Sequence, residues 1–373
     1  MTLGAYRIDD IEDIPSPAVV VFEPLVEANL DRTIALTGGP ERLRPHCKTH
    51  KTYEVIKMWL RRGVNLQKCA TLREAQMCIE AGCRDVIIAY QLIGPMAKQV
   101  IRLAQAFPEA RITSLADTPE VVEELGRSAH AAGVRLGVMV DLDLGLHRTG
   151  IAPEEAFDLC TLITKQSNLW FAGLHNYDAH NRSPDPAVRE RAVVDSIHRI
   201  EALTWRLHDA SLEVPEILCG GSATAHFYAQ RGLPYRGSPG TTVFWDHGYA
   251  SRIPDLEPLF TPAALILGRV ISKPLPDYLT LDVGNKAIAS DPPIGQRGLI
   301  IGLEDAVTHT HNEEHWTIQS LWAYRYNVGS HVLIVPEHIC PCTNLHPVLY
   351  VVDARGKLSG SWKVVARQRS LDL

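Results

Sequence analysis

Short apolar runs alternate with helix-length segments along more than half of the chain, and this alternation limits the available folds more than any other feature. Between residues 18 and 241 the runs are rich in β-branched and apolar residues, and the segments between them carry apolar residues at helical spacing. Strands joined by helical crossovers run parallel in one sheet. When the first run is set aside, eight strand–helix units remain over roughly 200 residues, which is typical of a (β/α)8 barrel.

These runs also define where the barrel strands are expected. They are AVVVF (18–22), RPHCK (44–48), NLQKCA (65–70), DVIIAY (85–90), ITSLAD (112–117), LGVMVDL (136–142), WFAGLH (170–175), EILCGG (216–221) and YRGSPG (235–240). A doubly wound open sheet is the alternative, because it also alternates strands with helices. We predict the barrel, with an active site at the carboxyl ends of its strands.

The pattern changes after Trp245. Apolar runs continue, but Gly, Pro and Asn turns join them and no helix-length segment lies between them. Such a pattern is typical of an all-β domain, and a length of 373 residues also suggests two domains. We therefore predict an α/β barrel over 18–250 and a β domain over 251–373, joined by residues 1–17.

The composition excludes several classes of function. The net charge of −6 gives no basic surface for nucleic acid. No window of about eighteen apolar residues predicts a membrane span, and the acidic N-terminal residues are unlike a secretory signal. The eight cysteines follow no disulfide-framework spacing. We expect a cytoplasmic protein with reduced thiols, without a nucleic-acid partner and without membrane contact.

Titratable side chains gather where the expected barrel strands end. They are His46, Lys48, His50 and Lys51 after the first strand, Gln67 and Lys68 after the second, Asp117 after the fourth, Asp141, Asp143, His147 and Arg148 after the fifth, and His175, Tyr177, Asp178 and His180 after the sixth. Structural loops rarely collect so many titratable groups, so the pattern favours an enzyme.

Two glycine-rich segments predict a phosphate site. CGGSAT places Gly220, Gly221 and Ser222 after the seventh strand, and GSPGTT places Gly240 and Thr241 after the eighth. Backbone N–H groups in such turns bind phosphate, and barrels commonly bind phosphate at these two positions. Tight turns without a ligand are the alternative, but the two loops together favour phosphate.

Lys48 ends the first expected barrel strand in the segment RPHCKTHK. Neighbouring positive charge lowers the pKa of an amine, and a neutral amine condenses with an aldehyde. An isolated lysine is usually a solvated surface residue. A lysine at a strand end, facing phosphate loops across a barrel mouth, instead predicts attachment of a phosphate-bearing cofactor.

With these motifs the chain resembles the D-threonine aldolase and D-serine dehydratase family, which are pyridoxal-phosphate enzymes of the alanine-racemase-like fold. The resemblance covers essentially the whole chain and implies an N-terminal barrel followed by a β domain. RPHCKTHK is similar to the family segment whose first lysine carries pyridoxal 5'-phosphate, which implies that role for Lys48. It also implies a small D-amino acid as substrate and a homodimer.

The resemblance implies cofactor contacts for further residues. Gln67 falls in the family's QK segment, and Arg148, in GLHRTG, is similar to an arginine near the pyridoxal ring oxygen. Tyr177, in FAGLHNYDAH, is similar to a tyrosine facing the pyridine nitrogen. GGSAT and PGTTVFWDHGY are similar to the phosphate loops and to a substrate-side tyrosine, here Tyr249.

The segment PEHICPCTNLH contains an H-x-C pair, which by itself is more often structural than metal-binding. His338 and Cys340 are two residues apart, so on an extended segment their side chains leave from the same side. An imidazole and a thiolate suit Zn²⁺ well and Mn²⁺ less well. By resemblance this is the family's metal site, present as H-x-C in D-serine dehydratases and often as H-x-D in D-threonine aldolases. Two protein ligands leave positions for water and substrate, so we expect an open catalytic site for Zn, Mn, Co or Mg.

Aldolase and dehydratase chemistry differ in the bond that breaks. An aldolase removes the β-hydroxyl proton and breaks Cα–Cβ, whereas a dehydratase removes the α-proton and loses hydroxide with help from the metal. NLH after Cys340 is similar to the aldolase branch, whereas the cysteine ligand is similar to the dehydratase branch. We predict a D-threonine aldolase, with a D-serine or D-3-hydroxyaspartate dehydratase as the alternative.

An aldolase needs a base for the β-hydroxyl proton, and we expect His180 to be that base. The alternative interpretation is that His180 is an exposed loop histidine without a catalytic role.

Two functions of other classes are more distant alternatives. An amino-acid racemase on the same fold needs a second acid/base group and no metal, which the H-x-C motif argues against. A non-catalytic pyridoxal-phosphate carrier lacks a β domain, so residues 251–373 argue against it.

Overall fold

Seven parallel strands, paired in sequence order, form one of the two sheets. The computed structural model describes residues 6–373. The strands are β2 (Leu66–Cys69), β3 (Asp85–Gln91), β4 (Arg111–Ala116), β5 (Leu136–Leu142), β6 (Leu169–Asn176), β7 (Ile217–Cys219) and β8 (Tyr235–Gly237). Each pairs in parallel with the next, because a helical segment returns the chain to the same end of the sheet after each strand.

An irregular eighth segment closes this sheet into a barrel. Leu43 forms a parallel bridge with Gly237 of β8. His46 forms a parallel bridge with Lys68 of β2, and Lys68 N–H donates to the carbonyl of Pro45 at 2.9 Å. Pro45 has no N–H to give to the ladder, which explains why this segment is no regular strand. The predicted (β/α)8 barrel is confirmed.

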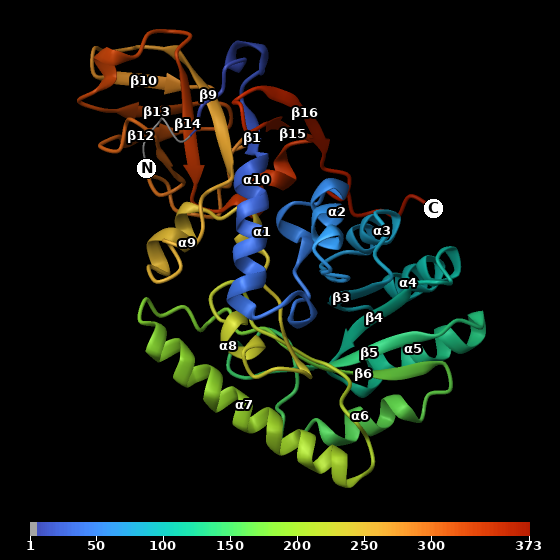
Figure 1. The fold of residues 1–373 in the computed structure, drawn as a ribbon. Coiled ribbons are helices and arrows are strands. Elements are labelled where there is room, and N and C mark those ends of the chain that lie inside the picture. Colours follow the sequence, from blue (N-terminus) through green and yellow to red (C-terminus); the bar gives the residue numbers. More distant parts are fainter. Residues whose placement is uncertain (1–5) are drawn as a thin grey trace. The chain divides into compact units, whose positions relative to one another are not determined.

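Helices cover the outside of the barrel. They are α2 (Tyr53–Arg61), α3 (Leu72–Glu80), α4 (Pro95–Ala106), α5 (Pro119–Ala132), α6 (Phe157–Thr164), α7 (Pro186–Asp209) and α8 (Ala225–Ala229), preceded by α1 (Glu23–Thr37). Figure 1 shows α4, α5 and α6 along the outer side of β3 to β6. In α4 the buried residues Ala97, Val100, Ile101 and Ala104 recur every three or four positions, the spacing of one helix face.

Apolar side chains fill the interior of the barrel. Ile87, Leu115, Met139 and Leu218 form one buried cluster, and each comes from a different strand. Such layers make the inside of a (β/α)8 barrel a packed core. Polar side chains are therefore accommodated at the ends of the strands.

The second sheet has nine strands of mixed direction. They are β1 (Ala18–Phe22), β9 (Ala264–Ser272), β10 (Tyr278–Leu281), β11 (Gly298–Ile300), β12 (Val307–His311), β13 (Trp316–Gln319), β14 (His331–Pro336), β15 (Val348–Val352) and β16 (Leu358–Lys363). β1 pairs antiparallel with β9 and parallel with β15, and all five of its residues are buried. A strand paired on both sides in this way is rich in β-branched residues.

The chain divides into two compact units. Of the described residues, the β unit holds 6–32, 49–52 and 241–367, and the barrel unit holds 33–48, 53–240 and 368–373. We expected the barrel to span 18–250, but β1 and most of α1 belong to the β unit because β1 pairs with β9 and β15. The β unit also contains two short helices that the sequence pattern missed, α9 (His247–Arg252) and α10 (Ile339–Leu345).

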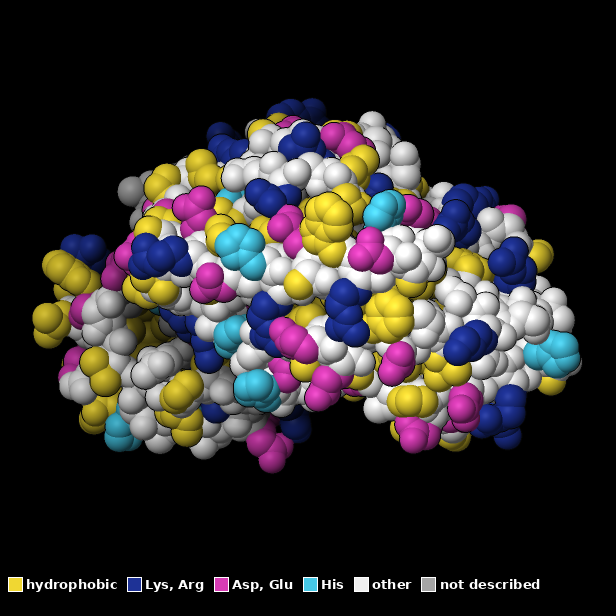
Figure 2. All heavy atoms as spheres, turned by 90° about the horizontal axis from the view of Figure 1, so that it is seen from below, with side chains coloured by type: hydrophobic (Ala, Val, Ile, Leu, Met, Phe, Trp, Pro, Cys, Tyr) yellow, Lys and Arg dark blue, Asp and Glu magenta, His cyan; other side chains and the backbone are white. Residues whose placement is uncertain are grey.

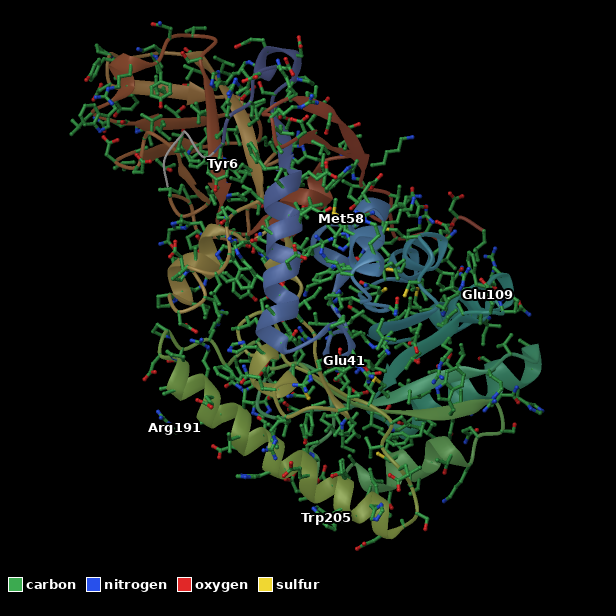
Figure 3. The ribbon with its side chains drawn as sticks, viewed as in Figure 1. Tyr6, Glu41, Met58, Glu109, Arg191 and Trp205 are labelled. Carbon is green, nitrogen blue, oxygen red and sulfur yellow. The ribbon has the colours of Figure 1, made fainter. Side chains whose placement is uncertain are left out.

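Charges of both signs are interspersed on the face of the molecule in Figure 2. The longest helix, α7, has 24 residues, and Figure 3 shows Arg191 and Trp205 projecting outward from it. Among residues 6–373 we find no helix whose length and apolar character would let it cross a membrane.

Candidate active site

A cavity of about 310 Å³ opens at the carboxyl ends of the barrel strands. This volume lies at the lower end of the range for small-molecule sites, about 300–1,000 Å³. Its polar lining consists of His46 and Lys48 from the first segment, Lys68 from β2, Gln91 from β3, Asp141 from β5, Arg148 and Thr149 from the loop after β5, His175 from β6, and Tyr177 just after β6. The cavity lies within the barrel unit and occupies the position expected for a barrel active site.

Three cations surround the ring of Tyr177. The Nζ atoms of Lys48 and Lys68 each lie 5.5 Å from the ring centroid, and the guanidinium carbon of Arg148 lies 4.9 Å from it. Burial, followed by the charge of Lys48, lowers the pKa of Lys68 to about 7, although Asp141 opposes the shift. The cavity therefore concentrates positive charge and favours an anionic ligand.

His175 and Asp141 form a buried pair beside these cations. Nδ1 of His175 lies 2.6 Å from Oδ1 of Asp141. Oδ2 of Asp141 accepts hydrogen bonds from the Thr149 hydroxyl at 2.8 Å and from the Gln91 amide at 3.0 Å. Burial and the charge of Lys68 lower the pKa of His175, so the imidazole is neutral and its proton lies on Nδ1.

This tautomer leaves Nε2 of His175 as an acceptor. Nε2 is buried and has no hydrogen-bond partner among the described residues. A buried polar atom left unpaired costs free energy, commonly about 1–3 kcal/mol, unless a ligand or water pairs with it. The cavity wall therefore presents one unused acceptor to a bound group.

The loop after β5 fixes the position of Arg148. Oδ1 of Asp143 accepts the N–H of Gly145 at 3.0 Å, which forms a tight turn before the arginine. On the other side, Thr149 donates to Asp141 at the end of β5. Because both flanks are anchored, the guanidinium is held beside Tyr177.

Two glycine-rich loops close one side of the site. A Cβ atom added to Gly221 would lie 3.0 Å from the Tyr177 ring, so a larger residue would press on the ring and shift it. Gly240 N–H donates to the Ser222 hydroxyl at 3.3 Å, which ties the loop after β8 to the loop after β7. The Ser238 hydroxyl between them is buried without a partner among the described residues. A phosphate group would satisfy such a donor.

These features fit pyridoxal phosphate. Lys48 supplies the amine that would hold the aldehyde, and Arg148 and Lys68 would balance the negative charge of the cofactor. The unpaired atoms of His175 and Ser238 would gain hydrogen-bond partners.

Not every residue expected at the site lines this cavity. Lys48, Arg148 and Tyr177 do, but Lys68 lines it in place of Gln67. Adjacent residues of a strand point to opposite faces, so β2 can present only one of the two to the interior. His180 is exposed in the loop after β6, and its Nε2 lies 3.2 Å from the position of a Cβ atom added to Gly145.

The H-x-C motif lies in the β unit. We expected an extended segment, but this is wrong beyond His338, because His338 is the N-cap of α10 and Cys340 lies in the first turn of that helix. Pro341 in the same turn is compatible with a helix start, where no intrahelical donor is needed. Nδ1 of His338 lies 2.6 Å from Oδ2 of Asp291, which leaves Nε2 for a metal ion.

The side chains of His338 and Cys340 interact with one another despite the change in backbone. Burial would lower the pKa of His338, but the hydrogen bonds and charges of Cys340 and Asp291 raise it to about 9. The Cys340 sulfur also lies 3.2 Å from the Thr49 hydroxyl and 3.8 Å from the Thr241 hydroxyl. The thiol and the imidazole are of the ligand types that suit a divalent ion such as zinc.

Asp246 connects this motif to Tyr249. Its Oδ1 accepts the Tyr249 N–H at 2.9 Å and its Oδ2 accepts the Ile339 N–H at 3.1 Å. Gly248 lies so close to the Glu337 carbonyl that an added Cβ atom would be 2.4 Å away. Helix α9 and the start of α10 are therefore held together within the β unit.

A closed parallel barrel, a lysine at the end of its first strand and glycine loops after its last two strands define a pyridoxal-phosphate enzyme of the alanine-racemase-like class. The family model of the alanine racemase N-terminal domain matches residues 25–244, and that of the putative serine dehydratase domain matches 263–352. The chain belongs to the alanine racemase N-terminal domain family, in the group that includes D-threonine aldolases, 3-hydroxy-D-aspartate aldolases and D-serine dehydratases. It is a pyridoxal-phosphate-dependent lyase.

Known relatives match nearly the full length of the chain. It is 29% identical over 373 residues to a D-threonine aldolase of Arthrobacter sp, covering 96% of this chain and 94% of the relative. It is 26% identical over 371 residues to a 3-hydroxy-D-aspartate aldolase of Paracoccus denitrificans (strain Pd 1222), covering 96% and 93%. A D-serine dehydratase of Dictyostelium discoideum is 22% identical over 391 residues, covering 95% and 98%.

A solved structure shows the same fold. The crystal structure of D-threonine aldolase from Filomicrobium marinum superposes with a TM-score of 0.86 at 25% sequence identity, covering 96% of this chain and 97% of that chain.

Proposed function

We propose that this protein is a D-threonine aldolase, which splits D-threonine into glycine and acetaldehyde. The observation that carries the proposal is the cavity in which Lys48, the two further cations Lys68 and Arg148, and Tyr177 meet. The similarity to a D-threonine aldolase over 96% of the chain supports the choice of substrate.

Some residues of the cavity attach the cofactor, and others stabilise the charge that develops during the reaction. When bound, pyridoxal phosphate withdraws electrons from the α-carbon of the amino acid and so stabilises negative charge there. Lys48 holds the aldehyde group of the cofactor, and the loops at Gly221 and Gly240 hold its phosphate. Asp141 fixes the His175 ring, so that its Nε2 can accept a hydrogen bond from a bound group.

The β-hydroxyl needs a group that accepts its proton. We propose His180 for this role, because it follows Tyr177 by three residues in the loop after β6. His175 is the second candidate, because its unprotonated Nε2 is buried in the cavity wall. A general base of this kind contributes roughly 10²–10⁴-fold to the rate.

His338 and Cys340 are the proposed ligands of a divalent metal ion, with Tyr249 nearby in the β unit. Such an ion polarises the hydroxyl group that it binds. Asp291 accepts a hydrogen bond from Nδ1 of His338 and so keeps Nε2 available as the ligand atom. A homodimer and a cytoplasmic location complete the proposal, and neither bears on the chemistry above.

D-serine or D-3-hydroxyaspartate dehydration is the second candidate function. The cysteine in the H-x-C motif supports it, as does the similarity to a D-serine dehydratase over 95% of the chain. We rank it second, because the D-serine dehydratase is 22% identical to this chain and the D-threonine aldolase is 29% identical.

Product analysis separates the two functions. The purified protein with pyridoxal phosphate and Mn²⁺ or Zn²⁺ is incubated with D-threonine, D-serine and D-3-hydroxyaspartate. We expect acetaldehyde and glycine from D-threonine in equal amounts, and no turnover of L-threonine. Release of only 2-oxobutyrate and ammonia would replace the aldolase with the dehydratase, and no product from any substrate would refute both.

A further inference from the structure

Three cysteines form a buried cluster behind the first barrel segment. Cys47 precedes Lys48, Cys69 ends β2, and Cys78 lies in α3. All three side chains are fully buried and belong to the barrel unit. The active-site chemistry described above uses none of them.

The sulfur atoms are spaced like the ligands of a tetrahedral metal ion. The Cys47 and Cys69 sulfurs are 3.7 Å apart, as are those of Cys69 and Cys78, and all three lie within 4.8 Å of one another. Zinc–thiolate bonds of about 2.3 Å in a tetrahedron place two sulfur atoms about 3.8 Å apart. A disulfide would need about 2.05 Å, so the thiols are reduced and in contact.

A buried carboxylate adjoins the cluster. Oε2 of Glu74 lies 3.6 Å from the Cys47 sulfur and accepts the Ala70 N–H at 2.6 Å. Glu74 is fully buried in the first turn of α3. A thiolate and a carboxylate oxygen on one zinc ion are about 3.5 Å apart, given bonds of about 2.3 and 2.0 Å. Glu74 forms a second group of possible ligand atoms with His46 and Cys47, separate from the group of three sulfur atoms. Its carboxylate therefore lies beside Cys47 and has to turn toward Cys69 and Cys78 to share one ion with them.

We propose that Cys47, Cys69 and Cys78 bind a zinc ion, and that the Glu74 carboxylate turns toward the ion from its place beside Cys47 to become the fourth ligand. Binding forms three Zn–S bonds and one Zn–O bond and releases three thiol protons to solvent. Four protein ligands leave no open position, so the site is structural. It is separate from the His338–Cys340 motif and does not depend on the proposed function.

Such an ion would stabilise the segment that carries Lys48. Cys47 follows the His46 bridge to β2, and Cys69 lies in β2 next to Lys68. One ion would join this irregular segment to β2 and to α3. The bridges at Leu43 and His46 would thereby gain a covalent constraint that their backbone bonds alone do not supply.

The test counts zinc in the variant His338→Ala/Cys340→Ser, which lacks the other proposed metal ligands. The holoenzyme is produced with added zinc, dialysed against a weak chelator and analysed by elemental mass spectrometry. We expect one zinc ion per chain in this variant. Adding Cys69→Ala should remove that zinc, whereas adding Cys160→Ala, at a buried thiol of α6 outside the cluster, should not.

X-ray absorption at the zinc edge of the same double variant gives a result that does not depend on the folding of Cys69→Ala. The proposal expects about three sulfur atoms at ~2.3 Å and one oxygen at ~2.0 Å. A zinc-free double variant would overturn the proposal. A zinc shell that contains only nitrogen and oxygen would overturn it as well, as would zinc that persists in a folded Cys69→Ala variant.

Discussion

Nδ1 of His175 lies 2.6 Å from Oδ1 of Asp141, and both side chains are buried at the carboxyl end of the barrel. This contact selects the tautomer with a free acceptor at Nε2. Asp141→Asn should favour the other tautomer and lower kcat by about 10²–10⁴-fold. Thr149→Val removes one hydrogen bond to Asp141 but leaves the pair, so it should cost less than about tenfold. Steady-state kinetics across pH compares the two variants, and equal losses would contradict this role for Asp141.

Lys48 should be the site of covalent cofactor attachment. Borohydride treatment of the holoenzyme should fix pyridoxal phosphate to a peptide that contains Lys48, as measured by mass spectrometry. Lys48→Ala should give no such peptide and should lose turnover. Lys68→Met serves as the control, because it removes a second cavity amine and should still be labelled at Lys48. Labelling at residue 68 in the wild type would contradict the assignment.

The amine of Lys68 should make the cofactor-free protein more stable at alkaline pH. Burial and the charge of Lys48 lower its pKa from 10.5 to about 7 in the fold. Between pH 7 and 10.5 the unfolded chain binds a proton that the folded chain does not, so stability rises with pH across this window and falls as pH decreases. The effect should reach about 2–5 kcal/mol.

Urea unfolding at several pH values measures this effect. Lys68→Met has no such amine, so its free energy of unfolding should change less between pH 7 and 10 than that of the wild type. Parallel curves for the two proteins would show that Lys68 is not the cause.

His180 separates the two candidate functions. If it accepts the β-hydroxyl proton, His180→Ala should lose acetaldehyde production from D-threonine by roughly 10²–10⁴-fold. Exchange of the α-proton with solvent should fall far less, because it depends on Lys48 and the cofactor. Nuclear magnetic resonance in D₂O follows both reactions. His180→Ala with unchanged acetaldehyde release would move the base to His175.

Asp291 should strengthen metal binding at His338 without binding the metal itself. Asp291→Asn should weaken the affinity for Mn²⁺ by about 10–100-fold, because the His338 ring loses its anchor at Nδ1. Electron paramagnetic resonance titration with Mn²⁺ measures this affinity and is insensitive to a thiolate-rich zinc site. Asp353→Asn, at a turn of the same unit, is the matched control and should bind Mn²⁺ as the wild type does.

Periodicity was sufficient to predict the barrel because its strands are continuous apolar runs. The run at 136–142 coincides with β5, and that at 85–90 differs from β3 by one residue. The first segment was harder to interpret, because Pro45 interrupts the ladder and only two bridges define it. In the β unit, β12 (Val307–His311) was not predicted, since its polar sequence VTHTH lacks an apolar run.

The residues of the site could be predicted where a motif identified them. They were harder to predict where the alternation of side chains along a strand determines which residue points inward. Lys48, Arg148 and Tyr177 were assigned by resemblance and line one cavity. The choice between Gln67 and Lys68 depended on which face of β2 points inward, and the motif alone does not determine that. The pairing of Asp141 with His175 depended on register between β5 and β6, where the two residues are direct partners.

The bridge between Leu43 and Gly237 affects the order in which parts of the chain can fold during synthesis. The two residues are nearly two hundred positions apart, so the segment that carries Lys48 has a partner on one side only until β8 has left the ribosome. Until then the nascent barrel has two exposed edges. β1 stays unpaired for longer, because its partners β9 and β15 are synthesised later. The barrel unit should therefore fold first during synthesis. In a chain arrested shortly after β8, the barrel should already resist proteolysis while β1 remains unpaired.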